Sequence, residues 1–122
     1  MQVSKQRLNK TIEKHVYSIL YQLIADIKTT HEARILLTDI LSETELQVIA
    51  KRVSIALFLD KGRSYENIKS TLRVSSATIA NVQDSMGSPG IQMALQKVKA
   101  EEWADSWADK ITNIVGKILP AK

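Results

Sequence analysis

Apolar residues in the first quarter of the chain recur every three or four positions, which is the period of one face of an α-helix. Leucine, isoleucine and tyrosine side chains beside this face widen it into a broad stripe. Such a stripe has more apolar surface than one small neighbouring helix covers, so the pattern predicts packing against a second chain. Its positions are Leu8, Ile12, Val16, Tyr17, Ile19, Leu20, Tyr21, Leu23, Ile24 and Ile27.

Two further helices are predicted before the middle of the chain. The first fits residues 31–41, and Thr29 or Thr30 can cap it, because a hydroxyl accepts from the free amides of a first turn. Ser42-Glu-Thr-Glu45 then forms a capping box that opens the second helix. This helix is apolar on two faces and is expected to be buried on both. Gly62, which adopts positive φ easily, is expected to end it.

The last third of the chain opens with Ser88-Pro89, an N-cap followed by proline at the first helical position. Apolar residues of positions 89–118 then fall on two nearly opposite faces. Either the helix breaks near residues 99–102, or one long helix contacts different elements at its two ends. Pro120 ends the segment. The second face, which we interpret as core or dimer interface, comprises Trp103, Trp107, Ile111, Ile114 and Ile118.

Composition supports a single all-α domain. The chain has 122 residues, of which 44% are hydrophobic and 25% charged, with only 4 Gly and 2 Pro. This length suffices for one core, and the mixture is that of a globular protein. We divide the domain into N-terminal dimerisation helices (1–41), a helix followed by a helix-turn-helix (42–86) and a C-terminal helical segment (87–122).

Several function classes have no support in the sequence. Cysteine is absent, which excludes disulfides and thiolate chemistry. His15 and His31 lie on different predicted helices without a metal-ligand pattern, and no nucleophile–base pair or phosphate-binding glycine loop is present. No apolar run reaches the ~20 residues of a membrane span, and the N-terminal run lacks a cleavage site. We expect a cytoplasmic protein that is not an enzyme and has no metal or cofactor.

Residues 65–84 carry the pattern of a helix-turn-helix. Ser64 can cap its first helix, and Ser75 or Ser76 its second. Arg73 occupies the turn position where φ is positive and glycine is usual. Any two helices packed around a tight turn share part of this pattern. The five apolar core positions of the motif are all filled, by Ile68, Leu72, Val74, Ile79 and Val82.

The outward face of the second motif helix is poorly suited to hold DNA by itself. It has no lysine or arginine and contains Asp84. Asn81 can pair with an adenine edge and the alanines can contact thymine methyl groups, so the candidate base-reading residues are Ser76, Ala77, Ala80 and Asn81. The net charge is +4, but residues 42–86 contribute only six basic and five acidic side chains. Candidate phosphate contacts are Lys61, Arg63, Lys69 and Arg73, together with the basic N-terminal arm.

The chain from Ile40 to Met86 resembles the tryptophan-repressor-like superfamily, and its YerC/YecD branch more closely than the repressor itself. The similar segment is ILSETELQVIAKRVSIALFLDKGRSYENIKSTLRVSSATIANVQ. The resemblance implies an all-helical, intertwined homodimer that presents two helix-turn-helix motifs to double-stranded DNA.

The resemblance also implies a candidate effector pocket formed by Ser42, Arg52, Thr78 and Asn81. In the tryptophan repressor two arginines sandwich the indole ring of the corepressor. Arg52 matches the first arginine, whereas the second falls on Asn81, which has no planar cation. We therefore expect no binding of tryptophan.

The sequence thus favours a DNA-binding transcriptional regulator of the tryptophan-repressor-like type. The alternative is a helical homodimer that keeps the fold but acts as a protein-interaction module without DNA binding. Convergence of Lys61, Arg63, Lys69 and Arg73 beside the second motif helix would favour the first of these functions.

Overall fold

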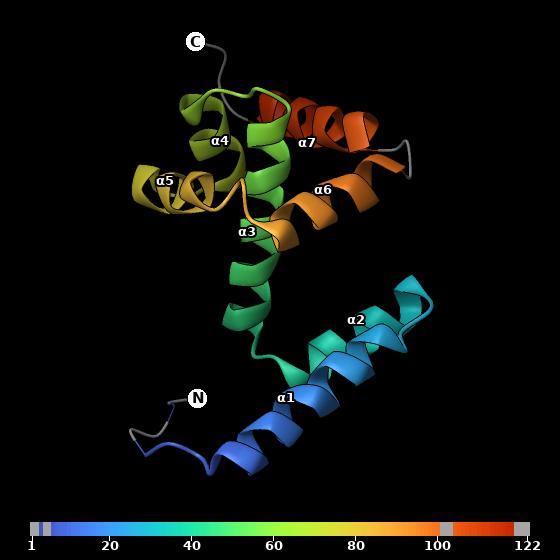
Figure 1. Ribbon diagram of the computed structural model, residues 1–122. Coiled ribbons are helices and arrows are strands. Elements are labelled where there is room, and N and C mark those ends of the chain that lie inside the picture. The colour runs from blue at the N-terminus through green and yellow to red at the C-terminus, as the bar shows by residue number, and fades with distance from the viewer. Residues whose placement is uncertain (1–2, 4–5, 101–103, 119–122) are drawn as a thin grey trace. The chain divides into compact units, whose positions relative to one another are not determined.

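The computed structural model describes residue 3, residues 6–100 and residues 104–118, and this part of the chain contains helices and no strand (Figure 1). The prediction of an all-helical fold is therefore confirmed. The chain divides into two compact units, Met1–Glu43 and Thr44–Lys122. The helices are α1 (Lys10–Ala25), α2 (Thr30–Ile40), α3 (Glu43–Asp60), α4 (Tyr65–Leu72), α5 (Ser76–Asp84), α6 (Pro89–Ala100) and α7 (Ala104–Ile118).

The first unit contains α1 and α2, and each helix begins with a side-chain cap. Asn9 Oδ1 accepts from the amide of Thr11 at 2.8 Å, and Thr29 Oγ1 accepts from the amide of Glu32 at 3.1 Å. These bonds satisfy amides that have no partner within the helix. Of the two caps predicted for α2, the structure selects Thr29.

No residue of α1 or α2 is buried. The predicted apolar stripe of α1 is present, but its side chains are exposed, Ile19 at 68% and Tyr21 at 65%. Ile40 at the end of α2 is exposed at 64%. The first unit thus has helices without a core of its own.

Helix α3 begins directly after Ser42 and is buried only in its C-terminal half. Ile55 and Phe58 have no exposed surface, whereas Val48, Ile49 and Val53 are about half exposed. The expectation that α3 is buried on two sides therefore holds for residues 55–58 and not for the N-terminal half. Gly62 follows the helix with φ 76°, as predicted for the residue that ends it.

Helices α4 and α5 form the predicted helix-turn-helix and pack against each other. Ser64 Oγ accepts from the amide of Asn67 and Ser75 Oγ from that of Thr78, each at 3.1 Å. The five predicted core positions all contribute to the core. Ile68, Ile79 and Val82 are buried, and Leu72 and Val74 are half-buried.

The C-terminal segment consists of two helices, α6 and α7, rather than one. Helix α6 begins at Pro89, as the sequence predicts, and its Leu95 is buried in the core. Ile111 of α7 packs against the same core. The residues between the two helices lie outside the described part of the chain. So do Trp103 and the side chains of Trp107 and Ile118, which make up much of the predicted second apolar face.

Two ion pairs join the C-terminal helices to the rest of the second unit. Arg63 Nη2 lies 2.6 Å from Asp109 Oδ1 of α7, and Lys99 Nζ of α6 lies 2.8 Å from Asp60 Oδ2 at the end of α3. Exposed pairs of this kind contribute ~0–1 kcal/mol each. They therefore add little to the stability that the apolar core supplies.

The turn between α4 and α5 contains backbone strain at the predicted position. Arg73 has φ 56° and ψ 57°, the left-handed conformation. For a residue with a Cβ atom this conformation costs about 1–2 kcal/mol, because Cβ crowds the following carbonyl oxygen.

Arg73→Gly is expected to be more stable than Arg73→Ala by about 1 kcal/mol in free energy of unfolding. Both changes remove the side chain, but only glycine adopts positive φ without the steric cost. Urea denaturation at fixed protein concentration measures the difference. Ser70, in the regular backbone of α4, is the control: there alanine should be more stable than glycine. Equal stability of the two Arg73 variants would contradict the strain.

Candidate nucleic-acid interface

The outer face of α5 is exposed along its length. Helical periodicity places Ile79 and Val82 in the core and turns the intervening residues to solvent. The structure therefore brings the four candidate base-reading residues onto one surface, and Asp84 shares it. The exposed residues of this face are Ser76, Ala77, Ala80, Asn81 and Asp84.

Asn81 is held from behind by α3. Arg52 Nη1 donates to Asn81 Oδ1 at 3.2 Å. Because a guanidinium only donates, this bond fixes which end of the Asn81 amide faces Arg52. The Asn81 NH₂ group and the second lone pair of Oδ1 remain for an outside partner. That combination of donor and acceptor is what recognition of an adenine edge requires.

A hollow of about 350 Å³ lies between the middle of α3 and the helix-turn-helix turn. Lys51 Nζ donates to the carbonyl oxygen of Arg73 at 3.2 Å, and this bond connects α3 to the turn. The hydroxyls of Ser75 and Thr78 lie 2.9 Å apart at the start of α5. Three cations thus surround a surface with two hydroxyls. The residues that line the hollow are Val48, Lys51, Arg52, Arg73, Val74, Ser75 and Thr78.

The four candidate phosphate residues differ in their surroundings. Of the four, Arg73 alone lines the hollow, so the predicted set does not converge there; Arg73 is exposed. Lys69 is half-buried in the last turn of α4, and Lys61 is half-buried in the loop after α3. Arg63 is paired with Asp109, and its guanidinium carbon lies 5.8 Å from the centroid of the Phe58 ring. The positive charge of Arg63 is therefore partly balanced by the carboxylate of Asp109.

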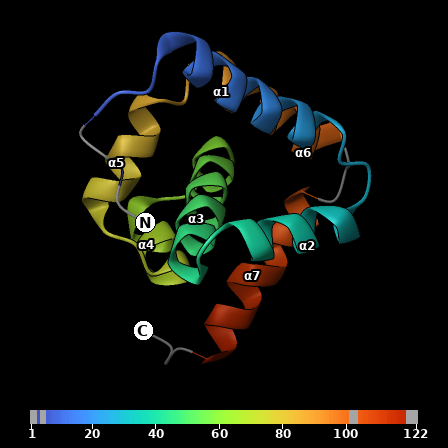
Figure 2. The same ribbon diagram turned by 90° about the horizontal axis from the view of Figure 1, so that it is seen from below.

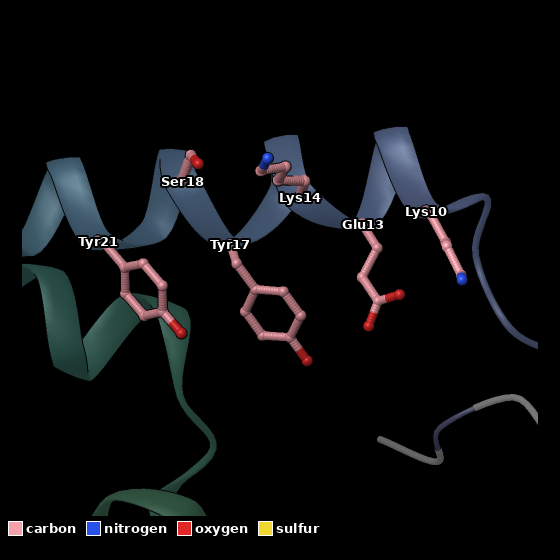
Figure 3. Close-up of a pocket in the computed structure, with 6 residues that line it drawn as sticks. All are labelled: Lys10, Glu13, Lys14, Tyr17, Ser18 and Tyr21. Atoms are coloured by element: carbon pink, nitrogen blue, oxygen red, sulfur yellow. The ribbon is translucent and has the colours of Figure 1, made fainter.

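A second hollow lies on α1 and is formed by side chains of that single helix (Figure 3). The rings of Tyr17 and Tyr21 stack with centroids 6.1 Å apart and point to the same side of the helix as Glu13. Lys14 and Ser18 point to the other side (Figure 3). This surface lies at the edge of the apolar stripe, to which only its two tyrosines belong, and one helix does not enclose a ligand.

Within residues 6–100 and 104–118, His, Asp and Glu side chains do not gather in groups of three that suit a metal ion. In the same part of the chain no helix has the length and apolar character required to cross a membrane.

Comparison with known proteins identifies the family. The profile of the family described as "Trp repressor protein" matches residues 15–99, well over half of the chain. The chain belongs to the Trp repressor family. It is also 30% identical over 108 residues to a Bacillus subtilis (strain 168) protein designated "Uncharacterized protein YerC", an alignment that covers 87% of this chain and 98% of that protein. No solved structure matches the chain.

Membership of the Trp repressor family agrees with the predicted resemblance to its YerC-like branch and points to a regulator of the DNA-binding type. The match spans all of α2 to α5 and most of α1 and α6. It therefore includes the helix-turn-helix, the outer face of α5 and the hollow beside the turn.

The residues of the candidate effector pocket are brought together only in part. Arg52 and Thr78 both line the hollow, and Arg52 is bonded to Asn81. Ser42 belongs to the other compact unit. The Arg52–Asn81 bond joins the two positions that the resemblance matches to the family's two arginines.

Sequence reasoning did not single out Lys51. Its only signal is its place beside Arg52 in the AKRV segment. That signal is weak, because successive residues of a helix project about 100° apart and so do not share a face. Its contact with Arg73 joins residues 22 positions apart, which periodicity within one helix does not reveal.

Free tryptophan is expected not to bind. Asn81 offers an amide where the Trp repressor pocket needs a stacking cation, and the remaining cation, Arg52, is already bonded to Asn81. Isothermal titration calorimetry checks this. Asn81→Arg supplies the missing cation and is the matched variant. Micromolar binding of tryptophan to the unmodified protein would contradict the prediction.

Proposed function

We propose that the protein is a homodimeric, DNA-binding transcriptional regulator of the tryptophan-repressor type that acts in the cytoplasm. The observation that carries this proposal is the exposed outer face of α5, set on a buried helix-turn-helix core and bordered by cations at the turn. Membership of the Trp repressor family supports it.

In this function, holding and reading DNA are separate tasks. Arg73, Lys51 and Arg52 lie beside the start of α5, where they can contact phosphates on either side of the groove. Asn81 is the main candidate for reading a base edge, with small contributions from the alanines. Asp84 on the same face repels phosphate. We therefore expect modest affinity, with electrostatics supplying most of it.

The homodimer is proposed from the exposed apolar surface of the first unit. In proteins, most of the stability of a helix comes from tertiary packing of its apolar face. Neither α1 nor α2 has a buried residue, and the apolar stripe of α1 is exposed. An exposed apolar patch of this kind marks an interaction site. We assign residues 1–41 to dimerisation with a second copy of the chain.

Charge placed in the apolar stripe is expected to dissociate the dimer. Ile19→Glu introduces a carboxylate where burial in the partner would remove it from water, at a cost of several kcal/mol. Sedimentation should show a monomer with reduced helicity. Ser18→Glu, at the centre of the polar face of α1, is the matched control and should remain dimeric. A folded monomer in the unmodified protein, with melting independent of concentration, would contradict the dimer.

DNA binding is expected to depend steeply on salt and weakly on sequence. Arg73→Ala should weaken binding to every duplex and lower the salt slope by about one, because one phosphate contact is lost. Asn81→Ala should change the preference at one base pair by about 1–3 kcal/mol and leave the slope unchanged. Asp84→Asn should strengthen binding. Fluorescence anisotropy on several duplexes across a salt series measures all three effects.

Lys97→Ala, in the last turn of α6, is the control for removal of a cation that does not line the hollow. It should change DNA binding less than Arg73→Ala does. If the unmodified protein binds no duplex at low salt, DNA binding is refuted and the interaction-module function replaces it. Nanomolar binding that is insensitive to salt would refute the proposed division between holding and reading.

A further inference from the structure

The hollow beside the helix-turn-helix turn concentrates positive charge. Lys51 and Arg52 reach it from α3, and Arg73 from the turn. None of the described residues that line it is acidic. Three like charges around one concave surface repel one another, so an anion bound among them is stabilised by all three.

Two of the three cations are oriented by hydrogen bonds. Lys51 Nζ is bonded to the Arg73 carbonyl oxygen, and Arg52 Nη1 to Asn81 Oδ1. An ammonium has three donors and a guanidinium five, so each of these side chains has further donors available to a ligand. Side chains that are already oriented lose less entropy when they bind.

Arg73 stands where the backbone favours glycine. Its left-handed conformation is strained, and its exposed side chain contributes nothing to the apolar core. A strained backbone at a ligand-facing residue is a recurrent feature of functional sites. What Arg73 provides at this turn, and glycine would not, is a guanidinium in the hollow.

The remaining lining suits a phosphate group on a small molecule. The Ser75 and Thr78 hydroxyls offer hydrogen bonds to its oxygens, and arginine binds phosphate in bidentate geometry. Val48 and Val74 give the hollow an apolar wall for a short carbon skeleton. The volume of about 350 Å³ lies at the small end of the range for ligand pockets.

We propose that this hollow binds a small phosphorylated molecule through Lys51, Arg52 and Arg73. The ligand is a second phosphate-bearing anion for the cations that, in the proposed function, hold DNA phosphates. It therefore competes with DNA and releases the protein from its operator. This regulatory consequence rests on the proposed function, whereas binding of the ligand does not.

Glycerol 3-phosphate is the probe, with glycerol as its neutral counterpart and acetate as a singly charged carboxylate. Amide ¹H–¹⁵N spectra of the full-length chain follow residues 51–52 and 73–78 during titration. Glycerol 3-phosphate should shift these signals, whereas glycerol and acetate should not at equal concentration and ionic strength. Arg73→Gly, which suits the local backbone, should weaken binding about tenfold by removing a charge-assisted contact. Lys97→Gln should bind like the unmodified protein.

Anisotropy with labelled duplex DNA supplies the second arm. Glycerol 3-phosphate should displace DNA beyond the effect of sodium chloride at the same ionic strength. If DNA shifts the signals of residues 73–78 and glycerol 3-phosphate does not, the small-molecule site is refuted and the hollow belongs to the DNA interface alone. Equal shifts with acetate would refute the phosphate class. If no duplex binds but glycerol 3-phosphate still shifts the hollow, the proposed function fails and the ligand site stands.

Discussion

The second unit depends on the packing of the C-terminal half of α3 against both helices of the helix-turn-helix. Ile55 and Phe58 of α3, Ile68 of α4 and Ile79 of α5 have no exposed surface. Figure 2, which views the chain from below, shows α3 next to α4 within this unit. Because such cores are close-packed, the position of α5 follows from these contacts. The outward direction of Asn81 is thus a consequence of the burial of Ile79 and Val82 two residues before and one after it.

The first unit, in contrast, has no buried core to hold its helices in place. Ordering the backbone of each residue costs about 1–2 kcal/mol, and buried apolar surface must offset this cost. Helices α1 and α2 show the caps and periodicity of stable helices but no buried residue. Capping bonds of ~1 kcal/mol each are too small to replace a core. The free energy that holds these helices together is therefore expected from an interface with another chain.

The sequence was sufficient for features that depend on neighbouring residues. The cap at Ser64, the positive φ of Arg73 and the start of α6 at Pro89 follow from local sterics and hydrogen bonding, and the structure confirms them. The pairing of Arg63 with Asp109, 46 positions apart, had no local signal. The hollow beside the helix-turn-helix turn also had no local signal, because its cations come from α3 and from a turn about 20 residues later. Such contacts are set by how whole helices pack, and periodicity identifies a buried face without its partner.

Arg52 takes part in both phosphate contact and base reading in the proposed function. Its guanidinium lines the cationic hollow and also donates to Asn81, the side chain best placed to read a base. Only one of the five guanidinium donors is used in the bond to Asn81, so the others remain for an anion in the hollow. In the proposed function, one side chain thus both orients the reading amide and contacts phosphate. A regulator whose α5 has no basic residue on its outer face then gains both affinity and alignment from cations that lie outside that helix.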